Sequence, residues 1–213
     1  MDSEFLLQNW MGEVFKGNLH FQEAGDLMEH RVQLLRCSGG IGKCLIMVGG
    51  LPGSGKTCFA SDIHTCCMQL GGQHSPSGLG WEIEILAESD FFQKQGIPFD
   101  MERLEEAQAW TYARFEEVFE RTYADVIVVE CIHLTPDQYE RYVAGAKEHG
   151  VPTLWVQFVC DSLEQAESLG ARADLQVPSQ VVARWYNSEY AEFAFGNSEQ
   201  GLILVAPKGD FVP

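Results

Sequence analysis

The chain alternates between two patterns of apolar and polar residues, which predict strands and helices in turn. Short apolar runs, such as Cys44 to Val48 and Asp125 to Val129, have the length and composition of buried strands. Between these runs lie longer segments whose apolar residues recur every three or four positions, as Leu104, Ala107 and Phe115 do. That spacing predicts amphipathic helices with one face turned toward a core.

The predicted elements follow one another as strand and helix from residue 44 onward. Strands are predicted over residues 44–48, 81–87, 125–129, 152–159 and 201–206. Helices are predicted over residues 56–70, 101–121, 135–150, 161–170 and 178–193, with loops over 71–80 and 91–100. Because strands that alternate with helices form a parallel sheet with covered faces, we expect an α/β fold with a central, mainly parallel sheet and helices on both faces.

Residues 1–38 carry apolar positions at helical spacing ahead of the first strand, among them Phe5, Trp10 and Val14. We expect two amphipathic helices that form an extension, which either packs on the core or binds a protein partner. A chain of 213 residues is long enough for one sizeable core and short for two. Residues 39–213 are therefore expected to form a single domain.

The stretch GGLPGSGKT, between the first predicted strand and the helix after it, has the spacing of a P-loop, G-x-x-x-x-G-K-[ST]. In such a loop backbone N–H groups and a helix N-terminus converge on phosphate, the lysine adds a positive charge, and the threonine offers a hydroxyl to Mg²⁺. We therefore expect Mg²⁺ and a nucleoside triphosphate, ATP or GTP. The expected binding residues are Gly50, Leu51, Pro52, Gly53, Ser54, Gly55, Lys56, Thr57 and Cys58.

Polar residues follow two further strands at the edge where ligands of parallel α/β sheets bind. Ser89 and Asp90 follow the second predicted strand, and Glu130 and His133 follow the third. We expect these strand ends to lie beside the phosphate loop. His133 is interpreted as a packing or hydrogen-bonding residue rather than a catalyst.

The charge of the chain disfavours a long polynucleotide as a partner. Acidic residues outnumber basic ones by 31 to 14, which gives a formal net charge of −17. Nucleic-acid binding relies on lysines and arginines that displace counterions, and the sequence has no run of them that would line a basic groove. The excess acid has an ordinary alternative, a solvated surface that keeps the protein in solution.

The cysteines, the apolar runs and the N-terminal stretch indicate the cellular compartment of the protein. The seven cysteines include no C-x-x-C pair, so we expect reduced thiols rather than disulfides or a zinc site. No apolar run approaches the roughly 20 residues that a membrane span needs, so we expect no membrane association. The acidic N-terminal stretch has neither the basic start of a signal peptide nor an arginine-rich transit composition. We expect a cytoplasmic or nuclear protein, with an organelle as the remaining alternative.

Several stretches together resemble a known family: GLPGSGKT, SDFF with the later PFD, LEEAQAWTYAR, and VIVVECIH with YERYV and HG. They resemble the P-loop kinases related to polynucleotide kinase, the family that includes the kinase-like domain of NEDD4-binding protein 2. The similarity covers roughly residues 43–190, and the segment from Phe99 to Arg114 is more specific than the P-loop. It implies a P-loop kinase-like three-layer fold over residues 39–213, with a lid around residues 161–180.

The resemblance also implies roles for single residues in phosphoryl transfer. Asp90 would be the general base for the acceptor hydroxyl, and Glu130 would join Thr57 around Mg²⁺. Lys56 and Arg172 would contact the transferring phosphate, the latter from the lid, with Arg184 as an alternative. Arg114 is predicted to orient an acceptor phosphate. The alternative is that Arg114 only forms an ion pair at the surface.

The sequence departs from the family where acceptor and metal chemistry would take place. Ser89 stands in place of the first residue of an Asp-Asp doublet, and Gln108 stands where the family usually has histidine. The stretch from Glu130 to His133 replaces Asp-Asn-Thr-Asn. Two interpretations follow. One is an ATP-dependent kinase that acts on a short nucleic-acid 5′-hydroxyl or a small alcohol; the other is a catalytically degraded nucleotide-binding protein that serves as a structural component of a larger assembly.

Overall fold

The computed structural model describes residues 43–74, 82–120, 124–131, 136–173, 175–187 and 202–205, and for 66–74, 136–138 and 202–205 only the backbone is considered. The strands are β1 (Cys44–Gly49), β2 (Ile83–Ala87), β3 (Val126–Glu130), β4 (Thr153–Phe158) and β5 (Leu202–Val205). The helices are α3 (Lys56–His74), α4 (Ser89–Gln95), the 3₁₀ helix η1 (Met101–Arg103), α5 (Leu104–Glu120), α6 (Pro136–Glu148), α7 (Leu163–Ala171) and α8 (Ser179–Trp185).

The described strands form one parallel sheet in the order β2-β3-β1-β4-β5. β1 lies in the middle, where Val48 is the register partner of Glu130 on β3 and Gly49 that of Gln157 on β4. All six residues of β1 are buried, as expected for a strand with neighbours on both sides and helices on both faces. The predicted α/β fold with a parallel sheet is confirmed.

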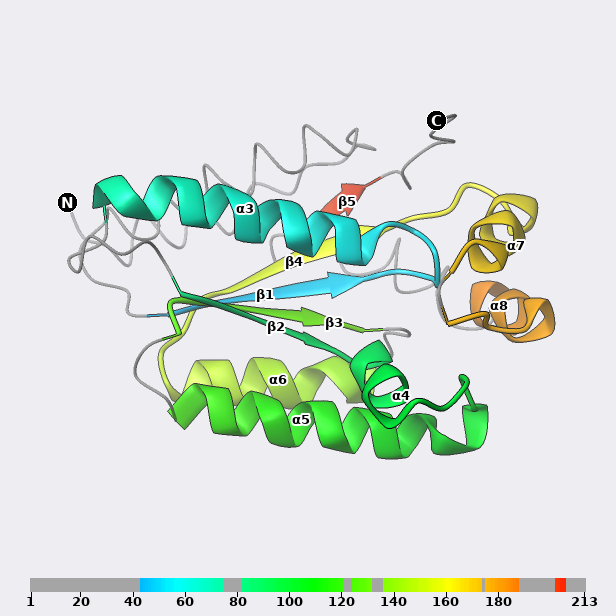
Figure 1. The fold of residues 1–213 in the computed structure, drawn as a ribbon, viewed down its shortest axis with the longest axis horizontal. Coiled ribbons are helices and arrows are strands. Elements are labelled where there is room, and N and C mark those ends of the chain that lie inside the picture. The colour runs from blue at the N-terminus through cyan, green and yellow to red at the C-terminus, as the bar shows by residue number, and fades with distance from the viewer. Residues whose placement is uncertain are drawn as a thin grey trace.

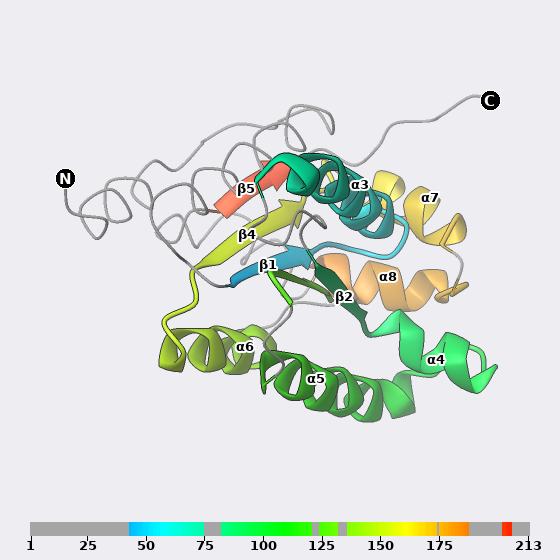
Figure 2. The ribbon, with the colours of Figure 1, turned by 60° about the vertical axis from the view of Figure 1, so that its left-hand side comes forward.

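Helices cover both faces of the sheet, which gives the three layers that were expected. In Figure 1, α3 lies over one face, and α5 and α6 lie over the other. The strand arrows point toward α4, α7 and α8, and the turned view in Figure 2 keeps this arrangement. A buried apolar cluster at this edge joins the loop after β1 to α4, α7 and α8, and it includes Leu51, Phe92, Leu169 and Trp185. The phosphate loop and the predicted lid therefore share one core.

The predicted loop over residues 91–100 is wrong in its first half, where helix α4 lies. Phe91 and Phe92 of this helix are buried, with ring centroids 5.2 Å apart. The helix ends at Gly96, whose φ of 64° is left-handed and whose N–H bonds back to the last turn. A helix of seven residues completes only about two turns, too few for its periodicity to stand out from the sequence.

Helix α3 also runs past its predicted end at residue 70 and reaches His74. It continues through Gly71 and Gly72, because glycine costs a helix only about 1 kcal/mol per residue and does not by itself end one. The expected helices of residues 1–38 and His133 lie outside the described residues. Among the helices that are described, none has the length and apolar character that crossing a membrane requires.

Candidate nucleotide-binding site

The loop between β1 and α3 has a backbone that only glycine adopts easily. Gly50 has a φ of 145° and Gly53 a φ of 75°. A Cβ added to Gly50 would lie 2.8 Å from both Ser54 Oγ and Phe158 Cβ, and one added to Gly53 would collide with the carbonyl oxygen of Leu169 at the end of α7. The loop is thus closely packed against its surroundings, and at Gly53 it lies directly against the predicted lid.

Lys56, the P-loop lysine, opens helix α3 and folds back over its own loop. Its Nζ donates to the carbonyl oxygen of Gly50 at 2.7 Å and to that of Leu51 at 2.9 Å. Burial lowers the pKa of Lys56, while the charge of Glu130 opposes this shift. The ammonium is therefore positioned at the loop, and a phosphate group would supply the counter-charge that its surroundings only partly provide.

Thr57 and Glu130 are in direct contact, as the strand-end rule predicted. The hydroxyl of Thr57 donates to Glu130 Oε2 at 2.8 Å, although the two residues come from α3 and the end of β3. Burial raises the pKa of Glu130, and the Thr57 hydrogen bond and the Lys56 charge oppose that shift. A buried carboxylate that its neighbours do not fully compensate favours a cation beside it.

The surroundings of this pair fit Mg²⁺. The other carboxylate oxygen of Glu130, Oε1, is buried and has no hydrogen-bond partner. Hydroxyl and carboxylate oxygens are ligands that Mg²⁺ prefers, and it commonly takes one or two of them together with waters and substrate phosphates. The described residues contain no cluster of three or more His, Cys, Asp or Glu that could hold a metal by itself. This arrangement therefore suits an ion that arrives with a nucleotide.

A pocket of about 330 Å³ brings the loop, the strand ends and the predicted lid together. Lys56, Thr57, Glu130 and Arg172, all predicted site residues, line it. The full lining is Pro52, Gly53, Gly55, Lys56, Thr57, Cys58, Ser89, Gln93, Glu130, Arg172, Ala173, Leu175 and Val177. Lys56 from the loop and Arg172 from the segment after α7 thus line one cavity, and Glu130 is the one carboxylate among its described lining residues. This excess of positive charge suits a polyphosphate.

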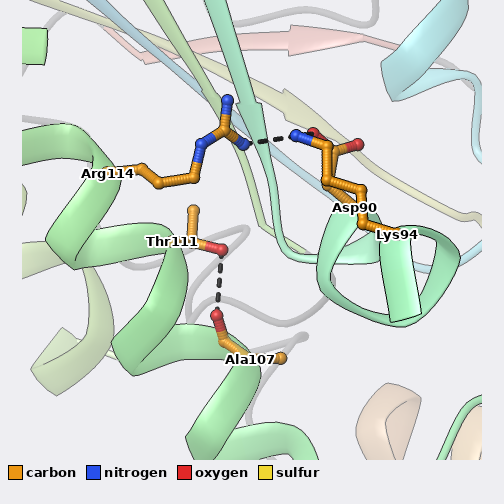
Figure 3. A network of polar contacts seen from close by, with 5 residues as sticks. All are labelled: Asp90, Lys94, Ala107, Thr111 and Arg114. Carbon is orange, nitrogen blue, oxygen red and sulfur yellow. Dashed lines mark hydrogen bonds and ion pairs between the residues drawn. The ribbon is translucent and has the colours of Figure 1, made fainter.

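Asp90 and Arg114 are not among the residues that line this pocket; instead they pair with each other. Arg114 Nη1 lies 3.2 Å from Asp90 Oδ2, and Lys94 Nζ lies 3.7 Å from the same oxygen (Figure 3). Arg114 and Lys94 also lie over the ring of Trp110, at 4.8 and 5.2 Å from its centroid. The ion pair that the sequence left as an alternative for Arg114 is present, and its partner is the predicted base.

Five pocket residues were not predicted as binding residues: Ser89, Gln93, Ala173, Leu175 and Val177. Ser89 and Gln93 lie one turn apart on α4 and line the pocket, whereas Asp90 belongs to the neighbouring face of that helix. The signal was available in principle, because residues four apart share a helix face. It was missed because α4 was predicted to be a loop. Arg184, the alternative lid arginine, is exposed on α8 and is not among the lining residues described.

Comparisons with known proteins identify a family and a relative. Residues 45–193 match the model of a family described as an AAA domain. The chain is 30% identical over 116 residues to human NEDD4-binding protein 2, and the matched part makes up 54% of this chain but only 6% of that protein. The chain thus spans a small fraction of the length of this relative.

Two solved structures share the fold. Kti12 of Chaetomium thermophilum, crystallised in complex with ADP-AlF3, superposes with a TM-score of 0.53 at 18% identity over 78% of this chain and 91% of that chain. The protein APE1195 superposes with a TM-score of 0.50 at 20% identity over 78% and 86%. At these identities the likeness shows the fold alone, an α/β fold of the P-loop kinase-like kind.

Proposed function

The chain belongs to the AAA domain family, and we propose that it binds a nucleoside triphosphate with Mg²⁺ and transfers the γ-phosphate to a hydroxyl group of an acceptor. The contact between Thr57 and Glu130 carries this proposal, because it joins the P-loop to a buried strand-end carboxylate inside the pocket. Phosphoryl transfer depends on positioning and charge neutralisation more than on covalent chemistry; Thr57 and Glu130 would position a Mg²⁺ ion, and the ion, Lys56 and Arg172 would neutralise charge.

The loop and Lys56 would hold the β- and γ-phosphates. Lys56 Nζ now donates to two carbonyl oxygens of the loop. A bound phosphate is a stronger acceptor than a carbonyl because it carries charge, so Lys56 would exchange one of these bonds for a charge-assisted one. The first N–H groups of a helix lack partners one turn earlier, so those at the start of α3 would add donors for the phosphates.

Thr57 and Glu130 would hold Mg²⁺, the threonine through its hydroxyl and the glutamate through a water molecule. Bound there, the ion would neutralise charge on the phosphate oxygens. Glu130 has a side chain one methylene longer than aspartate, so contact through water suits it better than direct coordination, given the strict geometry of Mg²⁺. ATP and GTP are both retained as nucleotides, since the described pocket residues contain no group that reads the base.

Arg172 would contact the transferring phosphate from the segment after α7. It lines the same pocket as the P-loop residues Gly55 and Lys56. The acceptor would enter on the side of Ser89 and Gln93, which line the same pocket from α4. Because the chain carries a formal charge of −17, a small alcohol or a short 5′-hydroxyl end suits it better than a long duplex.

A second candidate function is nucleotide binding without transfer, in a protein that has lost catalysis and serves a larger assembly. One observation favours it: Ser89 lines the pocket, while the neighbouring carboxylate of Asp90 pairs with Arg114 and Lys94. A general base must come within hydrogen-bond reach of the acceptor hydroxyl, so Asp90 would first have to leave these partners.

The test has two steps. Calorimetry and thermal shifts with ATP and GTP, with and without Mg²⁺, measure nucleotide binding; we expect binding that Mg²⁺ strengthens. Labelled ATP with a panel of oligonucleotides, nucleosides and sugars then measures transfer. Binding with transfer to one acceptor class supports the kinase, and binding without any labelled product supports the second candidate. A protein that binds neither nucleotide at millimolar concentration contradicts both.

A further inference from the structure

Cys58 lies on the wall of the nucleotide pocket, two residues into helix α3. Its thiol is exposed and forms no disulfide, whereas Cys44, Cys131 and Cys160 are buried. Of the cysteines whose side chains the structure describes, Cys58 is thus the one that a dissolved reagent can reach while the protein stays folded. It follows Thr57 directly, so a group attached to its sulfur would stand beside the phosphate loop.

A second, independent observation favours a ligand in the pocket that Cys58 lines. Glu130 is only 3% exposed, and its Oε1 atom has no hydrogen-bond partner although the residue lines the same pocket. Lys56 and Arg172 line it as well. Cys58 therefore lines the same cavity of about 330 Å³ as two cationic side chains, which attract an anion, and the Glu130 carboxylate, which attracts a cation. This setting distinguishes Cys58 from a cysteine that is merely exposed.

We propose that Cys58 is a thiol modification site at which a low-molecular-weight disulfide, such as glutathione disulfide, blocks nucleotide binding; this inference rests on the proposed nucleotide function. In the exchange, the Cys58 sulfur bonds to one sulfur of the reagent and the S–S bond of the reagent breaks. The other half leaves as a thiol and takes the proton that Cys58 loses. The reagent is the oxidant, and an added thiol reverses the reaction.

A glutathionyl group on Cys58 would exclude nucleotide from the pocket by steric overlap and by charge repulsion. A glutathionyl group is a tripeptide with two carboxylates and one ammonium group, so its net charge is negative, and it would be attached here to the wall of a cavity that a triphosphate has to enter. Its bulk competes for the same space, and its carboxylates repel the phosphates at short range. The relation works in both directions, because a bound nucleotide covers the Cys58 sulfur and slows its reaction.

The experiment uses the full chain in its reduced state. Nucleotide affinity is measured by calorimetry with Mg²⁺-ATP, the protein is then incubated with glutathione disulfide, and the modified residue is identified by peptide mass mapping. We expect modification at Cys58, a rise in Kd of at least about tenfold, recovery after dithiothreitol, and slower modification when Mg²⁺-ATP is present.

Cys58→Ser is the matched control, since it keeps every other cysteine, including Cys37, Cys66 and Cys67. Its treated and untreated forms are compared with each other, so that any change in its starting affinity cancels. We expect its Kd to be the same before and after glutathione disulfide. A rise equal to that of the wild type would place the effect on other thiols and overturn the proposal.

Two further results would overturn it: a protein capped at Cys58 that binds Mg²⁺-ATP as tightly as the reduced form, or a Cys58 that does not react while the protein is folded. Failure of the proposed function is seen separately. Reduced, untreated protein that binds no nucleotide contradicts that function before any disulfide is added, and this inference falls with it.

Discussion

The guanidinium of Arg114 on α5 lies 3.2 Å from the carboxylate of Asp90 on α4, and the two side chains are 24% and 29% exposed (Figure 3). The pair holds α4 against α5 at the carboxyl edge of the sheet, where Ser89 faces the nucleotide pocket. A partly exposed ion pair of this kind contributes at most about 1 kcal/mol to stability. Its larger effect is on chemistry, because it fixes the direction of the predicted base.

Replacing Asp90 by asparagine separates the two candidate functions. If Asp90 is the general base, Asp90→Asn should lower turnover with the acceptor by about a hundredfold or more, with little change in nucleotide affinity because the residue does not line the pocket. Steady-state kinetics with labelled ATP measure the first quantity, and calorimetry measures the second.

Lys94→Gln is the matched control for this substitution. It also removes a partner of the Asp90 carboxylate, the ion pair at 3.7 Å, but it leaves the carboxylate in place. Similar losses of turnover in both variants would mean that the ion pairs position α4 and that Asp90 takes no proton. A wild-type protein that binds ATP and labels no acceptor would support the second candidate instead.

Lys56→Ala should remove most of the thermal stabilisation by nucleotide. A ligand that binds only the folded state raises stability by about 2.7 kcal/mol at a concentration of 100 Kd, and the variant loses the one lysine that lines the described pocket. Melting curves with and without Mg²⁺-ATP test this. A shift that stays the same in Lys56→Ala would show that the P-loop is not where the nucleotide binds.

Glu130→Gln should have opposite effects on the nucleotide-free and the nucleotide-bound protein. Burial raises the pKa of Glu130, so the folded state holds this proton more tightly than the unfolded state does. The ionised carboxylate therefore destabilises the fold at about pH 7, and this cost disappears as the pH falls through the raised pKa. The variant should thus melt a few degrees higher than the wild type at about pH 7, with a smaller gain at lower pH.

With Mg²⁺ present, the same variant should bind nucleotide more weakly, because the amide is a poorer partner for the metal and its water shell. Binding without Mg²⁺ should change much less. Calorimetry in magnesium and in a chelator compares the two conditions. An equal loss in both would make Glu130 a structural residue of the strand end rather than part of a metal site.

Gly53→Ala should disturb the lid as well as the loop. A Cβ at Gly53 meets the Leu169 carbonyl, whereas Gly96, which also has a positive φ, has open space around it. Gly96→Ala is therefore the matched control for backbone strain alone, and Gly53→Ala should cost roughly 1–3 kcal/mol more in denaturant unfolding. Trypsin should also cut faster after Arg172 in Gly53→Ala. Equal stabilities of the two variants would contradict a close contact between loop and lid.

The sheet and the position of Glu130 beside the phosphate loop could be predicted from the sequence, because both follow from rules that act over long segments. Apolar runs mark buried strands, and parallel pairing brings Glu130 to the phosphate loop without any knowledge of side-chain contacts. The direction of Asp90 could not be predicted in the same way. It depends on a seven-residue helix that the pattern did not reveal and on a partner, Arg114, from another element.

The central place of β1 has a consequence for how the chain is made. β1 is the first of the described strands, yet its neighbours are β3 and β4, and β2 lies at the sheet edge. A nascent chain therefore exposes the apolar residues of β1 until β4 has left the ribosome, since non-local partners must be synthesised before they can pair. The pocket lining extends to Val177, which follows β4 in the chain, so the complete pocket forms only late in the synthesis of this protein.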